Sequence, residues 1–428
     1  MILYSEALDK LRDAARRRAV LTEQAALAAA VGRVVREEVS SPEAVPPFDN
    51  SAMDGFALRA EATREAVPDH PVRLSVKGLV AAGDRALPQL DASAGAVEIM
   101  TGAPILQGGF DSVVKLEDVE VRRRTTGEAE WIQLRRPVGL GENVRRRGED
   151  FARGQAVLTP GTRFRPEHVM ALASLGVAQI PVAARPRVAV IATGKELIDH
   201  AERSLPPGGI RNSTTPYLLA ALPLCGAEAR FLGVVADDPA HFAELFARAL
   251  ELKPDVVLVT GGISMGKFDF VLSSLEAVGA AVRFQKVAIR PGKPVLFAEL
   301  ASGPSVFGMP GNPIATAVAL RFFVEPYLRA ISGESEELPV KARLSAGVTK
   351  PEGLRCFYKA SLQASPMGLR VRVLPGQASF MVSPLLHSNS WVFLPEQGAM
   401  LSEGTDVDVF PLLPWAVEWN SNEEGRLT

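Results

Sequence analysis

Cysteine and histidine are scarce in this chain. Its 428 residues include only two cysteines and five histidines. Two thiols cannot build a disulfide framework or a thiolate metal site, and the scattered histidines form no paired-ligand motif. Any metal that the protein uses is therefore expected to be held by oxygen ligands.

An excess of charge of one sign and long apolar runs are also missing. The 47 basic and 49 acidic residues nearly cancel, which leaves a formal charge of −2 and no broad cationic field to hold nucleic acid or an anionic membrane. No window approaches the roughly eighteen apolar residues of a membrane span, and the N-terminus lacks a signal-peptide core. We expect a cytoplasmic protein whose anionic partners are small molecules.

Length and composition predict several globular domains. At about 150 residues per domain, this chain would hold roughly three, and its 47% hydrophobic residues can fill more than one core. Helical spacing over residues 5–30 predicts one or two amphipathic helices, and the Pro-rich stretch 41–47 marks a boundary. A small β-rich domain is expected next, with strands at residues 72–76, 96–100, 112–116 and 131–134.

From residue 187, long apolar strands alternate with helical patterns. Strands are predicted at residues 188–192, 230–235, 255–260, 282–287, 295–298 and 305–307. Helices are predicted at residues 216–224, 239–250, 270–278 and 313–331. This alternation indicates a doubly wound parallel sheet that is covered on both faces. Four to six further strands over residues 341–413 predict a small antiparallel barrel or sandwich, so the chain is expected to be multidomain, α/β plus β.

Four loops follow predicted strands of the α/β domain, where ligands of open sheets bind. They cover residues 193–197, 261–269, 290–294 and 308–313. Their glycines allow backbone N–H groups to approach a ligand, so the loops predict an anion pocket. Lys286, Arg290 and Lys293 would add positive charge to it. Glu196, Asp237 and Asp269 could hold a divalent cation against phosphate oxygens.

Two motifs in the second loop suggest other chemistry. Residues 261–267 fit the first part of a P-loop, but Phe268 stands where Mg²⁺ coordination needs Ser or Thr. Residues 262–266 fit a nucleophile elbow with Ser264 at its centre, and the only later histidine is His387. The simpler interpretation of Ser264 is a hydrogen bond to a phosphate or within the loop, and an esterase stays a minor alternative.

Nine motifs, read in chain order, make the sequence resemble a known family. The polar stretch FDNSAMDGFA (residues 48–57) would, by itself, be read as a network of turns and caps. The other motifs are MTGAP (100–104), RRRGED (145–150), ASLG (173–176), TGKEL (193–197), DDP (237–239), TGGIS (260–264), RPGKP (290–294) and GMPGNP (308–313). Together they are similar to the molybdopterin molybdenumtransferase family, which comprises the MoeA and gephyrin E-domain proteins, also called molybdenum insertases.

The resemblance implies a homodimer of elongated, four-part subunits. It also implies the reaction in which adenylylated molybdopterin and molybdate, with Mg²⁺, give molybdenum cofactor and AMP. Further partners would be the molybdopterin adenylyltransferase and molybdoenzyme acceptors. The expected domains are an extended β segment (22–46 with 140–183), a small β-rich domain (47–139), an α/β molybdopterin-binding domain (1–21 with 184–332) and a C-terminal β-barrel (333–428).

The resemblance assigns site residues, which would lie across the dimer. The catalytic candidates are Asp54, Asp150, Glu196, Asp237, Asp269, Lys286 and Lys293. The substrate-binding candidates are Ser51, Thr101, Thr193, Gly194, Gly261, Gly262, Ser264, Arg290, Pro291, Gly292, Pro310, Gly311, Asn312 and Pro313. The predicted metal ligands are Glu196, Asp237 and Asp269.

Several positions depart from the family pattern at the site. Lys195 stands where the family has an acid, Asn212 replaces another carboxylate, Arg290 replaces a lysine, and Ala315 replaces a serine that is often found there. Fewer acids should weaken Mg²⁺ binding, whereas arginine still suits phosphate or molybdate. These departures motivate a second hypothesis, in which the protein is a catalytically weakened paralogue that acts as a molybdopterin-binding or protein-binding scaffold.

Overall fold

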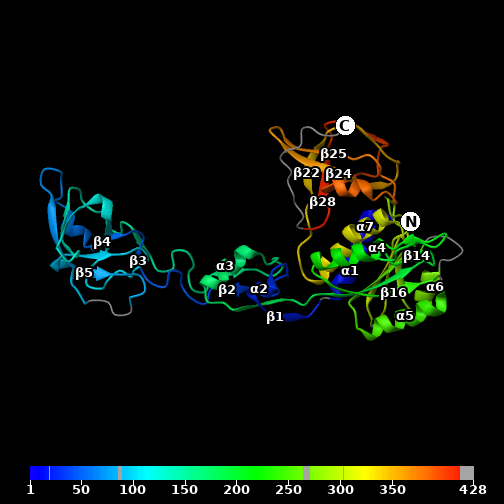
Figure 1. Ribbon diagram of the computed structural model, residues 1–428, viewed down its shortest axis with the longest axis horizontal. Coiled ribbons are helices and arrows are strands. Elements are labelled where there is room, and N and C mark those ends of the chain that lie inside the picture. Colours follow the sequence, from blue (N-terminus) through cyan, green and yellow to red (C-terminus); the bar gives the residue numbers. More distant parts are fainter. Residues whose placement is uncertain (19, 85–88, 237, 264–269, 302, 415–428) are drawn as a thin grey trace.

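The chain is elongated, with its units arranged one after another (Figure 1). The structure is a computed structural model that describes residues 1–18, 20–84, 89–236, 238–263, 270–301 and 303–414. A small β-rich unit lies at one end, a slender segment that contains α3 (Pro166–Ser174) lies in the middle, and an α/β unit and a β-barrel lie together at the other end. This multidomain α/β plus β architecture confirms the predicted fold class.

The small β-rich unit is one six-stranded sheet in the order β7-β4-β6-β5-β9-β8. Its strands are β4 (Gly55–Leu58), β5 (Val72–Val80), β6 (Ala96–Ile99), β7 (Ser112–Lys115), β8 (Glu120–Arg123) and β9 (Ala129–Leu134). Successive side chains of a strand point to opposite faces, and here both faces are buried: Phe56 packs in one apolar cluster and Ala57 in another. The four strands that the sequence predicts here are confirmed.

The slender segment is made of strand pairs, because the chain runs out to the small unit and returns beside itself. The antiparallel pairs are β1 (Thr22–Ala26) with β12 (Gln179–Ala183), β2 (Val39–Ser40) with β11 (Ala156–Leu158), and β3 (Asn50–Ser51) with β10 (Val144–Arg145). The helical prediction for residues 5–30 is therefore right only for α1 (Tyr4–Arg16); α2 (Leu27–Ala30) has a single turn. Backbone pairing with β12 overrides the helix propensity of the alanine-rich stretch.

The α/β unit is built on a six-stranded sheet in the order β16-β13-β17-β21-β20-β18. The strands are β13 (Arg187–Thr193), β16 (Glu228–Val235), β17 (Val256–Thr260), β18 (Ala281–Phe284), β20 (Leu296–Glu299) and β21 (Ser305–Met309). The first four in spatial order are parallel, as predicted, whereas β20 runs antiparallel to both of its neighbours. The chain between β20 and β21 spans only residues 300–304, which is too short for a parallel crossover.

Helices cover both faces of this sheet. The helices are α1, α4 (Thr214–Leu224), α5 (Pro239–Glu251), α6 (Phe270–Ala277), α7 (Pro313–Ala319) and α8 (Glu325–Ile331). Val188 and Val190 pack on the face with α1, α4, α7 and α8, and Ala189 and Ile191 pack on the face with α5 and α6. The doubly wound arrangement is confirmed. In the described part of the chain, no helix has both the length and the apolar character needed to cross a membrane.

The predicted helix over residues 313–331 is interrupted at its centre. Leu320–Val324 forms a π-helical turn between α7 and α8. Pro326 lacks the N–H group that an α-helix would donate to the Phe322 carbonyl, and a proline ring crowds the preceding turn. The Tyr4 hydroxyl of α1 donates to that carbonyl instead, at 3.2 Å. One proline thus changes the helix geometry and creates a contact between α1 and the π turn.

The C-terminal unit is a closed barrel. Five strands follow the circular order β24-β25-β22-β28-β26, and β24 pairs with β26 to close the circle. They are β22 (Val340–Leu344), β24 (Arg355–Ser365), β25 (Gly368–Val373), β26 (Ser390–Leu394) and β28 (Asp406–Pro411). A two-stranded pair, β23 (Val348–Thr349) with β27 (Met400–Leu401), is added to them, and β19 (Ile289–Arg290) of the α/β unit pairs with β24. The barrel alternative of the sequence prediction is correct, but the predicted antiparallel pairing is wrong for β22 and β25, which run parallel.

The barrel contains a lysine that is fully buried. Lys359 of β24 is 0% exposed, and its Nζ donates to the Met381 carbonyl at 2.8 Å. Burial disfavours the charged form and lowers the pKa of Lys359 to about 8 from its ordinary value of 10.5. Above pH 8 the folded barrel therefore binds fewer protons at this residue than the unfolded chain.

The buried lysine should make barrel stability depend on pH. Because the unfolded state holds more protons between pH 8 and 10.5, the free energy of unfolding should rise across that window, by up to about 3 kcal/mol. Lys359→Met should remove this rise. Denaturant unfolding at several pH values measures it, with Lys341→Met, an exposed lysine of the same barrel, as the control. A stability difference between wild type and Lys359→Met that stays constant with pH would contradict the prediction.

Candidate functional site

The strand order of the α/β sheet reverses between β13 and β17, and we use the word crevice for the carboxyl edge of the sheet at this switch point. The chain leaves β13 toward β16 on one side and later returns to β17 on the other, so the strand order reverses at this point. Ligands of open α/β sheets bind outside the carboxyl ends of strands at such a switch point. The loops that follow these two strands, at Thr193 and Gly261, are both among those predicted from the sequence.

The described parts of the first two loops are in contact. The Thr193 hydroxyl is buried and donates to the Thr260 carbonyl at 3.1 Å. Gly261 and Gly262 adopt φ angles of 80° and 61°. A Cβ atom on either residue would lie within 2.9 Å of the Thr193 Oγ1 atom. Glycine is therefore required here by both backbone conformation and space, and the loop leaves its backbone at the crevice.

The carboxyl end of β21 lies at the same crevice. The Gly261 N–H donates to the Met309 carbonyl at 2.9 Å, and a Cβ atom on Gly311 would lie 3.7 Å from the Gly261 Cα. Asn312 then stands at the N-cap position of α7 without a capping hydrogen bond from its side chain, and the Thr316 hydroxyl donates to the Pro310 carbonyl at 2.6 Å. The Ile314 N–H at the start of α7 donates to the Ser379 carbonyl of the barrel, so this helix end is already engaged with another unit.

The third predicted loop, residues 290–294, lies beside the start of α7; together with Lys286 we call it the basic loop. A Cβ atom on Gly292, whose φ is 97°, would lie 3.5 Å from the Ala315 carbonyl oxygen. The Val287 N–H donates to the Lys293 carbonyl at 3.0 Å, which closes the loop next to Lys286. Arg290 and Lys293 are exposed and Lys286 is half-buried. The described portions of all four predicted loops therefore form one contiguous surface.

Acidic residues at this crevice are described only in part. Glu196 is exposed, and its carboxylate folds back so that a Cβ atom on Gly194 would lie 2.7 Å from its Oε1. The predicted Asp237, Ser264 and Asp269 lie outside the described residues. Within the described ranges, no group of three or more His, Cys, Asp or Glu side chains is placed to hold a metal ion.

Asn212, one of the departures from the family pattern, has a structural contact. Its side chain is buried, its Oδ1 accepts from the Thr215 N–H at 3.1 Å, and its Nδ2 donates to the Thr215 hydroxyl at 2.9 Å. Asn212 therefore satisfies the Thr215 N–H in the first turn of α4. The sequence pattern reveals the lost carboxylate but not this capping role.

A second cluster lies on the small β-rich unit and centres on Asp54. The Thr101 N–H and hydroxyl both donate to the Asp54 Oδ1, at 2.7 and 2.8 Å. These bonds favour the ionised carboxylate and hold the pKa of Asp54 below its ordinary value. Asp54 is exposed, so two predicted residues from separate motifs present a charged carboxylate at the surface.

The arginine motif joins this cluster through Asp49, which the sequence analysis did not single out as a site residue. Arg147 donates its backbone N–H and Arg146 its guanidinium to the Asp49 carboxylate, at 2.8 and 2.7 Å, and these bonds lower the pKa of Asp49. Asp150 is exposed at the end of the same motif. The dense spacing of polar residues around Asp49 was the only signal in the sequence.

Ser51, another predicted binding residue, uses its hydroxyl locally. The side chain is fully buried, and its Oγ donates to the Met53 carbonyl at 2.5 Å and accepts from the Met53 N–H at 3.2 Å. This turn shapes the loop that presents Asp54. The interpretation of the stretch as a turn network therefore describes Ser51 well, while Asp54 and Thr101 remain exposed.

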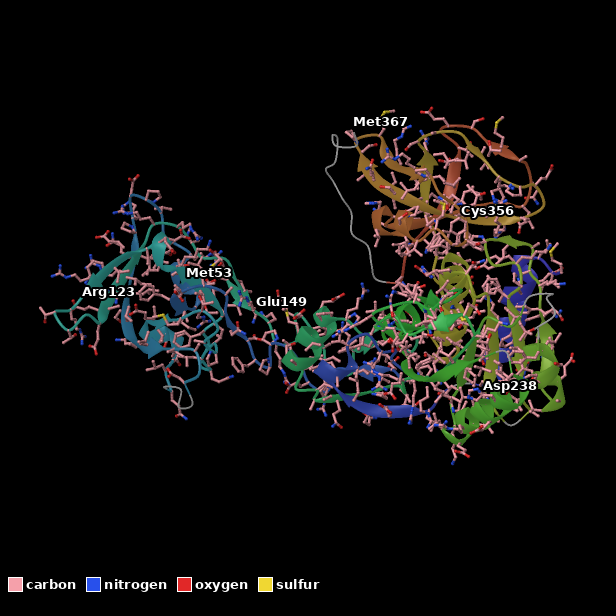
Figure 2. The ribbon with its side chains drawn as sticks, turned by 45° about the vertical axis from the view of Figure 1, so that its right-hand side comes forward. Met53, Arg123, Glu149, Asp238, Cys356 and Met367 are labelled. Carbon is pink, nitrogen blue, oxygen red and sulfur yellow. The ribbon has the colours of Figure 1, made fainter. Side chains whose placement is uncertain are left out.

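The α/β loops and the Asp54 cluster lie at opposite ends of the elongated molecule. Figure 2 shows Met53, next to Asp54, on the small β-rich unit, and Asp238 and Cys356 on the distant α/β unit and barrel. The slender segment of paired strands separates them (Figure 1). Within one chain, the fold thus assembles the α/β loops with one another but keeps them apart from Asp54.

Comparisons with known proteins agree along nearly the whole chain. Three family models match: the MoeA N-terminal region (domain I and II) at residues 2–176, a probable molybdopterin binding domain at 189–330, and the MoeA C-terminal region (domain IV) at 341–412. A molybdopterin molybdenumtransferase from Synechococcus elongatus is 38% identical over 96% of this chain and 99% of its own length. The Bacillus subtilis protein of that name is 34% identical over 92% of this chain and 93% of its own length.

Solved structures agree with the sequence relatives. The crystal structure of the molybdopterin biosynthesis MoeA protein from Pyrococcus horikoshii OT3 superposes with a TM-score of 0.80 at 31% identity, and it covers 96% of this chain and 99% of its own. The similarity therefore includes the barrel and the slender segment as well as the α/β unit.

Proposed function

This chain belongs to the MoeA family of molybdopterin molybdenumtransferases, and on that premise we propose that it inserts molybdate into adenylylated molybdopterin with release of AMP. It is an enzyme of molybdenum cofactor biosynthesis. The observation that supports the proposed step best is the crevice between β13 and β17, where glycine-rich loops meet beside Arg290 and Lys293. Exposed backbone and fixed positive charge are what phosphate and molybdate oxygens require.

We assign the basic loop to charge stabilisation. Lys286, Arg290 and Lys293 would hold the phosphate and molybdate oxygens and stabilise the charge that develops as the phosphoanhydride breaks. The backbone of the two glycine loops would orient the pterin nucleotide. A fixed cationic loop acts without reorganisation during the reaction, so its contribution should appear in the transition state as well as in binding.

We propose that Mg²⁺ is held by carboxylates after the strands of the α/β sheet. Glu196 is exposed after β13, and Asp237 and Asp269, which lie outside the described residues, would supply the other oxygen ligands that Mg²⁺ prefers. When bound, the ion supplies charge neutralisation at the phosphoanhydride. Asn212 supplies no carboxylate to the metal, and its buried side chain accepts the Thr215 N–H at the start of α4.

We also propose that a second copy of the chain completes the site. Met53 and Glu149, the chain neighbours of Asp54 and Asp150, lie at the far end of the slender segment from the α/β unit (Figure 2). A symmetric dimer would bring the small β-rich unit of one subunit to the crevice of the other. The domain limits that we propose are those given above: 22–46 with 140–183, 47–139, 1–21 with 184–332, and 333–428.

We place the reaction in the cytoplasm, with the molybdopterin adenylyltransferase as the source of substrate and molybdoenzymes as acceptors. The substrate is an adenylylated intermediate, so an enzyme that transfers AMP must precede this step. The scaffold alternative is not favoured, because the relatives that match nearly the whole chain are named as transferases. The esterase alternative is not favoured for the same reason, and its residue Ser264 lies outside the described residues.

The experiment that tests the proposed function is a direct assay. Purified protein should release AMP from adenylylated molybdopterin when molybdate and Mg²⁺ are present, and the product should activate an apo-molybdoenzyme. Omission of molybdate is the control. Binding of the pterin nucleotide without AMP release would contradict the enzymatic role and revive the scaffold hypothesis.

Removing a charge from the basic loop should weaken anion binding. Lys293→Ala should lower the affinity for molybdate or the pterin nucleotide by about 1.5–3 kcal/mol, roughly ten- to a hundredfold, because a charge-assisted hydrogen bond is lost. Titration calorimetry measures this change. Lys10→Ala, an exposed lysine on α1, is the matched control and should bind normally. Equal affinities for both variants would remove Lys293 from the site.

Restoring the family acid beside Glu196 should strengthen the response to metal. Lys195→Asp adds a carboxylate next to Glu196, so the Mg²⁺ concentration for half-maximal AMP release should fall severalfold. Lys195→Ala is the matched control, because it removes the ammonium without adding a ligand. If both variants shift the Mg²⁺ curve equally, charge removal alone explains the effect and position 195 does not address the ion.

A further inference from the structure

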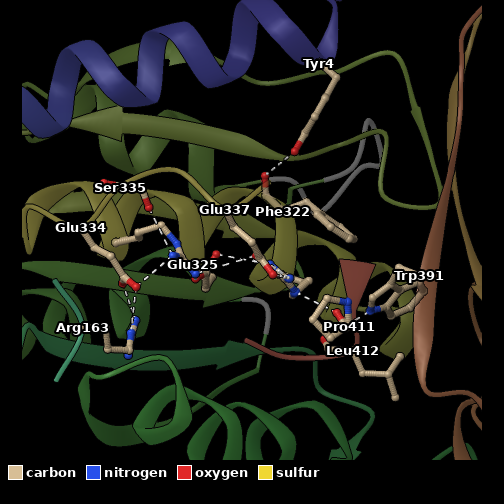
Figure 3. Close-up of polar contacts among 12 residues, drawn as sticks. Tyr4, Arg163, Phe322, Glu325, Glu334, Ser335, Glu337, Trp391, Pro411 and Leu412 are labelled. Atoms are coloured by element: carbon tan, nitrogen blue, oxygen red, sulfur yellow. Dashed lines mark hydrogen bonds and ion pairs between the residues drawn. The ribbon is translucent and has the colours of Figure 1, made fainter. Parts of the chain in front are cut away.

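A network of buried ion pairs lies where the α/β unit, the slender segment and the barrel adjoin (Figure 3). We call this cluster the junction hub; its members are Arg163, Arg321, Glu325, Arg329, Glu334 and Glu337. Three positive and three negative groups make it neutral. Five of the six side chains are at most 9% exposed, and Glu337 is 22% exposed. Buried ions of this kind must be fully paired to be tolerated.

Arg321 is the member that reaches the barrel. Its Nη2 donates to both carboxylate oxygens of Glu337, at 2.8 and 2.6 Å, and its Nε donates to the Pro411 carbonyl at 3.1 Å. Pro411 ends strand β28 of the barrel, and Glu337 belongs to the connection that leads into it. One rigid guanidinium therefore links the helical layer, the connection and the barrel wall in fixed geometry.

The π turn is what places Arg321 at this junction. Arg321 lies within Leu320–Val324, where Pro326 prevents regular α-helical hydrogen bonding. A π turn changes the angular spacing of side chains along the helix, and such turns are frequent at functional positions. Arg321 is 1% exposed, and its guanidinium carbon also lies 5.6 Å from the ring centre of Phe410 in the barrel. The irregular turn thus has a specific partner across the junction.

Apolar packing alone does not seal this junction. A cavity of about 480 Å³ opens between α1, α8 and the barrel, lined by Leu8, Phe393 and Phe410 among others. Aromatic packing also crosses the junction, since Phe322 of the π turn stacks on Phe357 of the barrel with ring centroids 4.6 Å apart. Apolar packing is non-directional, so polar contacts add the directionality that it lacks. The junction hub supplies those contacts beside the cavity.

The barrel that Arg321 holds also borders the candidate site. Strand β19, which ends at Arg290, pairs with β24 of the barrel, and the Ile314 N–H of α7 donates to the barrel residue Ser379. The helix that starts at the crevice continues through the π turn to Arg321. Placement of the barrel therefore affects the basic loop and the start of α7 together.

We propose that Arg321 is a positioning residue, which fixes the barrel against the α/β unit and thereby holds the barrel side of the crevice in its binding geometry. The part that concerns turnover rests on the proposed function. The structural part does not, because it concerns the relative placement of two units in the free protein.

The test changes Arg321 while keeping the junction hub neutral. Arg321→Met combined with Glu337→Gln removes one charge of each sign, so Arg329 still pairs with Glu325 and Glu334. Met367→Cys in the barrel and Glu276→Cys in α6 introduce two exposed labelling sites. Spin labels attached there report the distance between the two units by pulsed EPR. The native Cys225 and Cys356 are buried and should not be labelled.

The double variant should broaden the label-to-label distance distribution, which should be narrow in the wild type. It should also raise KM for the pterin nucleotide, because misplacement of the barrel side of the crevice weakens substrate binding. The ratio kcat/KM should then fall roughly ten- to a hundredfold while kcat changes little. Arg321→Lys keeps the charge but cannot make all the contacts at once, so its KM and distance distribution should be intermediate. This milder variant also gives the result if the double variant does not fold.

Glu299→Gln is the matched control. Glu299 is a buried carboxylate that pairs with Arg17 and Arg283 inside the α/β unit, away from the barrel. Its loss should lower thermal stability without broadening the distances. Unchanged distances in the Arg321 variants, or broadened distances with wild-type KM, would overturn the proposal. Absence of turnover in the wild-type protein would instead reject the proposed function, and the distance measurement would still decide the role of Arg321.

Discussion

Asp54→Asn is expected to leave the fold intact and to suppress AMP release at least roughly a hundredfold, the scale on which a positioned acid or base contributes. The amide is isosteric, and its oxygen can still accept the hydrogen bonds that Thr101 donates from its N–H and hydroxyl. What the substitution removes is the charge, which the two bonds stabilise at the surface. Turnover and thermal unfolding, measured on the same preparation, separate the two effects.

The matched control for Asp54 is Asp91→Asn. Asp91 is an exposed carboxylate of the same β-rich unit, accepts a backbone N–H from Ser93, and has a pKa that is lowered in the same way. It belongs to none of the family motifs, so its variant should keep full activity. If Asp54→Asn loses melting temperature and activity in proportion, or if both variants behave alike, Asp54 is a turn residue and the catalytic assignment fails.

A heterodimer of one Asp54→Asn subunit and one Lys293→Ala subunit is expected to regain about half of the wild-type turnover. In a twofold dimer with sites shared between subunits, one of its two sites combines both substitutions and the other combines neither. Each homodimer of a single variant carries the substitution in both sites and should stay nearly inactive. The expected gain over either parent is thus large, and it does not depend on the affinity of any single contact.

Co-expression with two different affinity tags allows the heterodimer to be purified, and AMP release per dimer is the measurement. The control heterodimer joins a wild-type subunit to a subunit that carries both substitutions. With shared sites, each of its two sites then contains one substitution, so it should be nearly inactive. If it keeps half the activity while the first heterodimer has none, both residues act within one chain and the proposed arrangement is wrong.

Much of the α/β unit was predictable from local pattern. Strands that are buried on both faces read as continuous apolar runs, and β13, β17 and β21 were located in this way. The positions of the loops followed, because parallel strands end at the same edge of a sheet. Errors arose where long-range pairing decided the structure, as in β1, whose alanine-rich sequence favours helix but pairs with β12.

The candidate site was predictable as a set of residues but not as an arrangement. The motifs indicate that Asp54, Thr101 and Lys293 matter, and spacing along the chain cannot reveal which of them meet. Asp54 and Thr101 are 47 positions apart and bonded. The slender segment, by contrast, separates the small β-rich unit that carries Asp54 from the α/β unit that carries Lys293 (Figure 1). Side chains with local partners, such as Ser51, also look identical in sequence to those left open for a ligand.

By itself, the sequence determined the fold class, the four loops at the crevice and the family, because these depend on local apolar periodicity and on short motifs read within a few residues. Only the tertiary structure decided that β20 runs antiparallel, that Pro326 produces a π turn, and that this turn carries Arg321 to the barrel wall at Pro411. The physical reason is distance along the chain. Arg321 and Pro411 are 90 positions apart, and such contacts are selected by the packing of whole units, which no local pattern encodes.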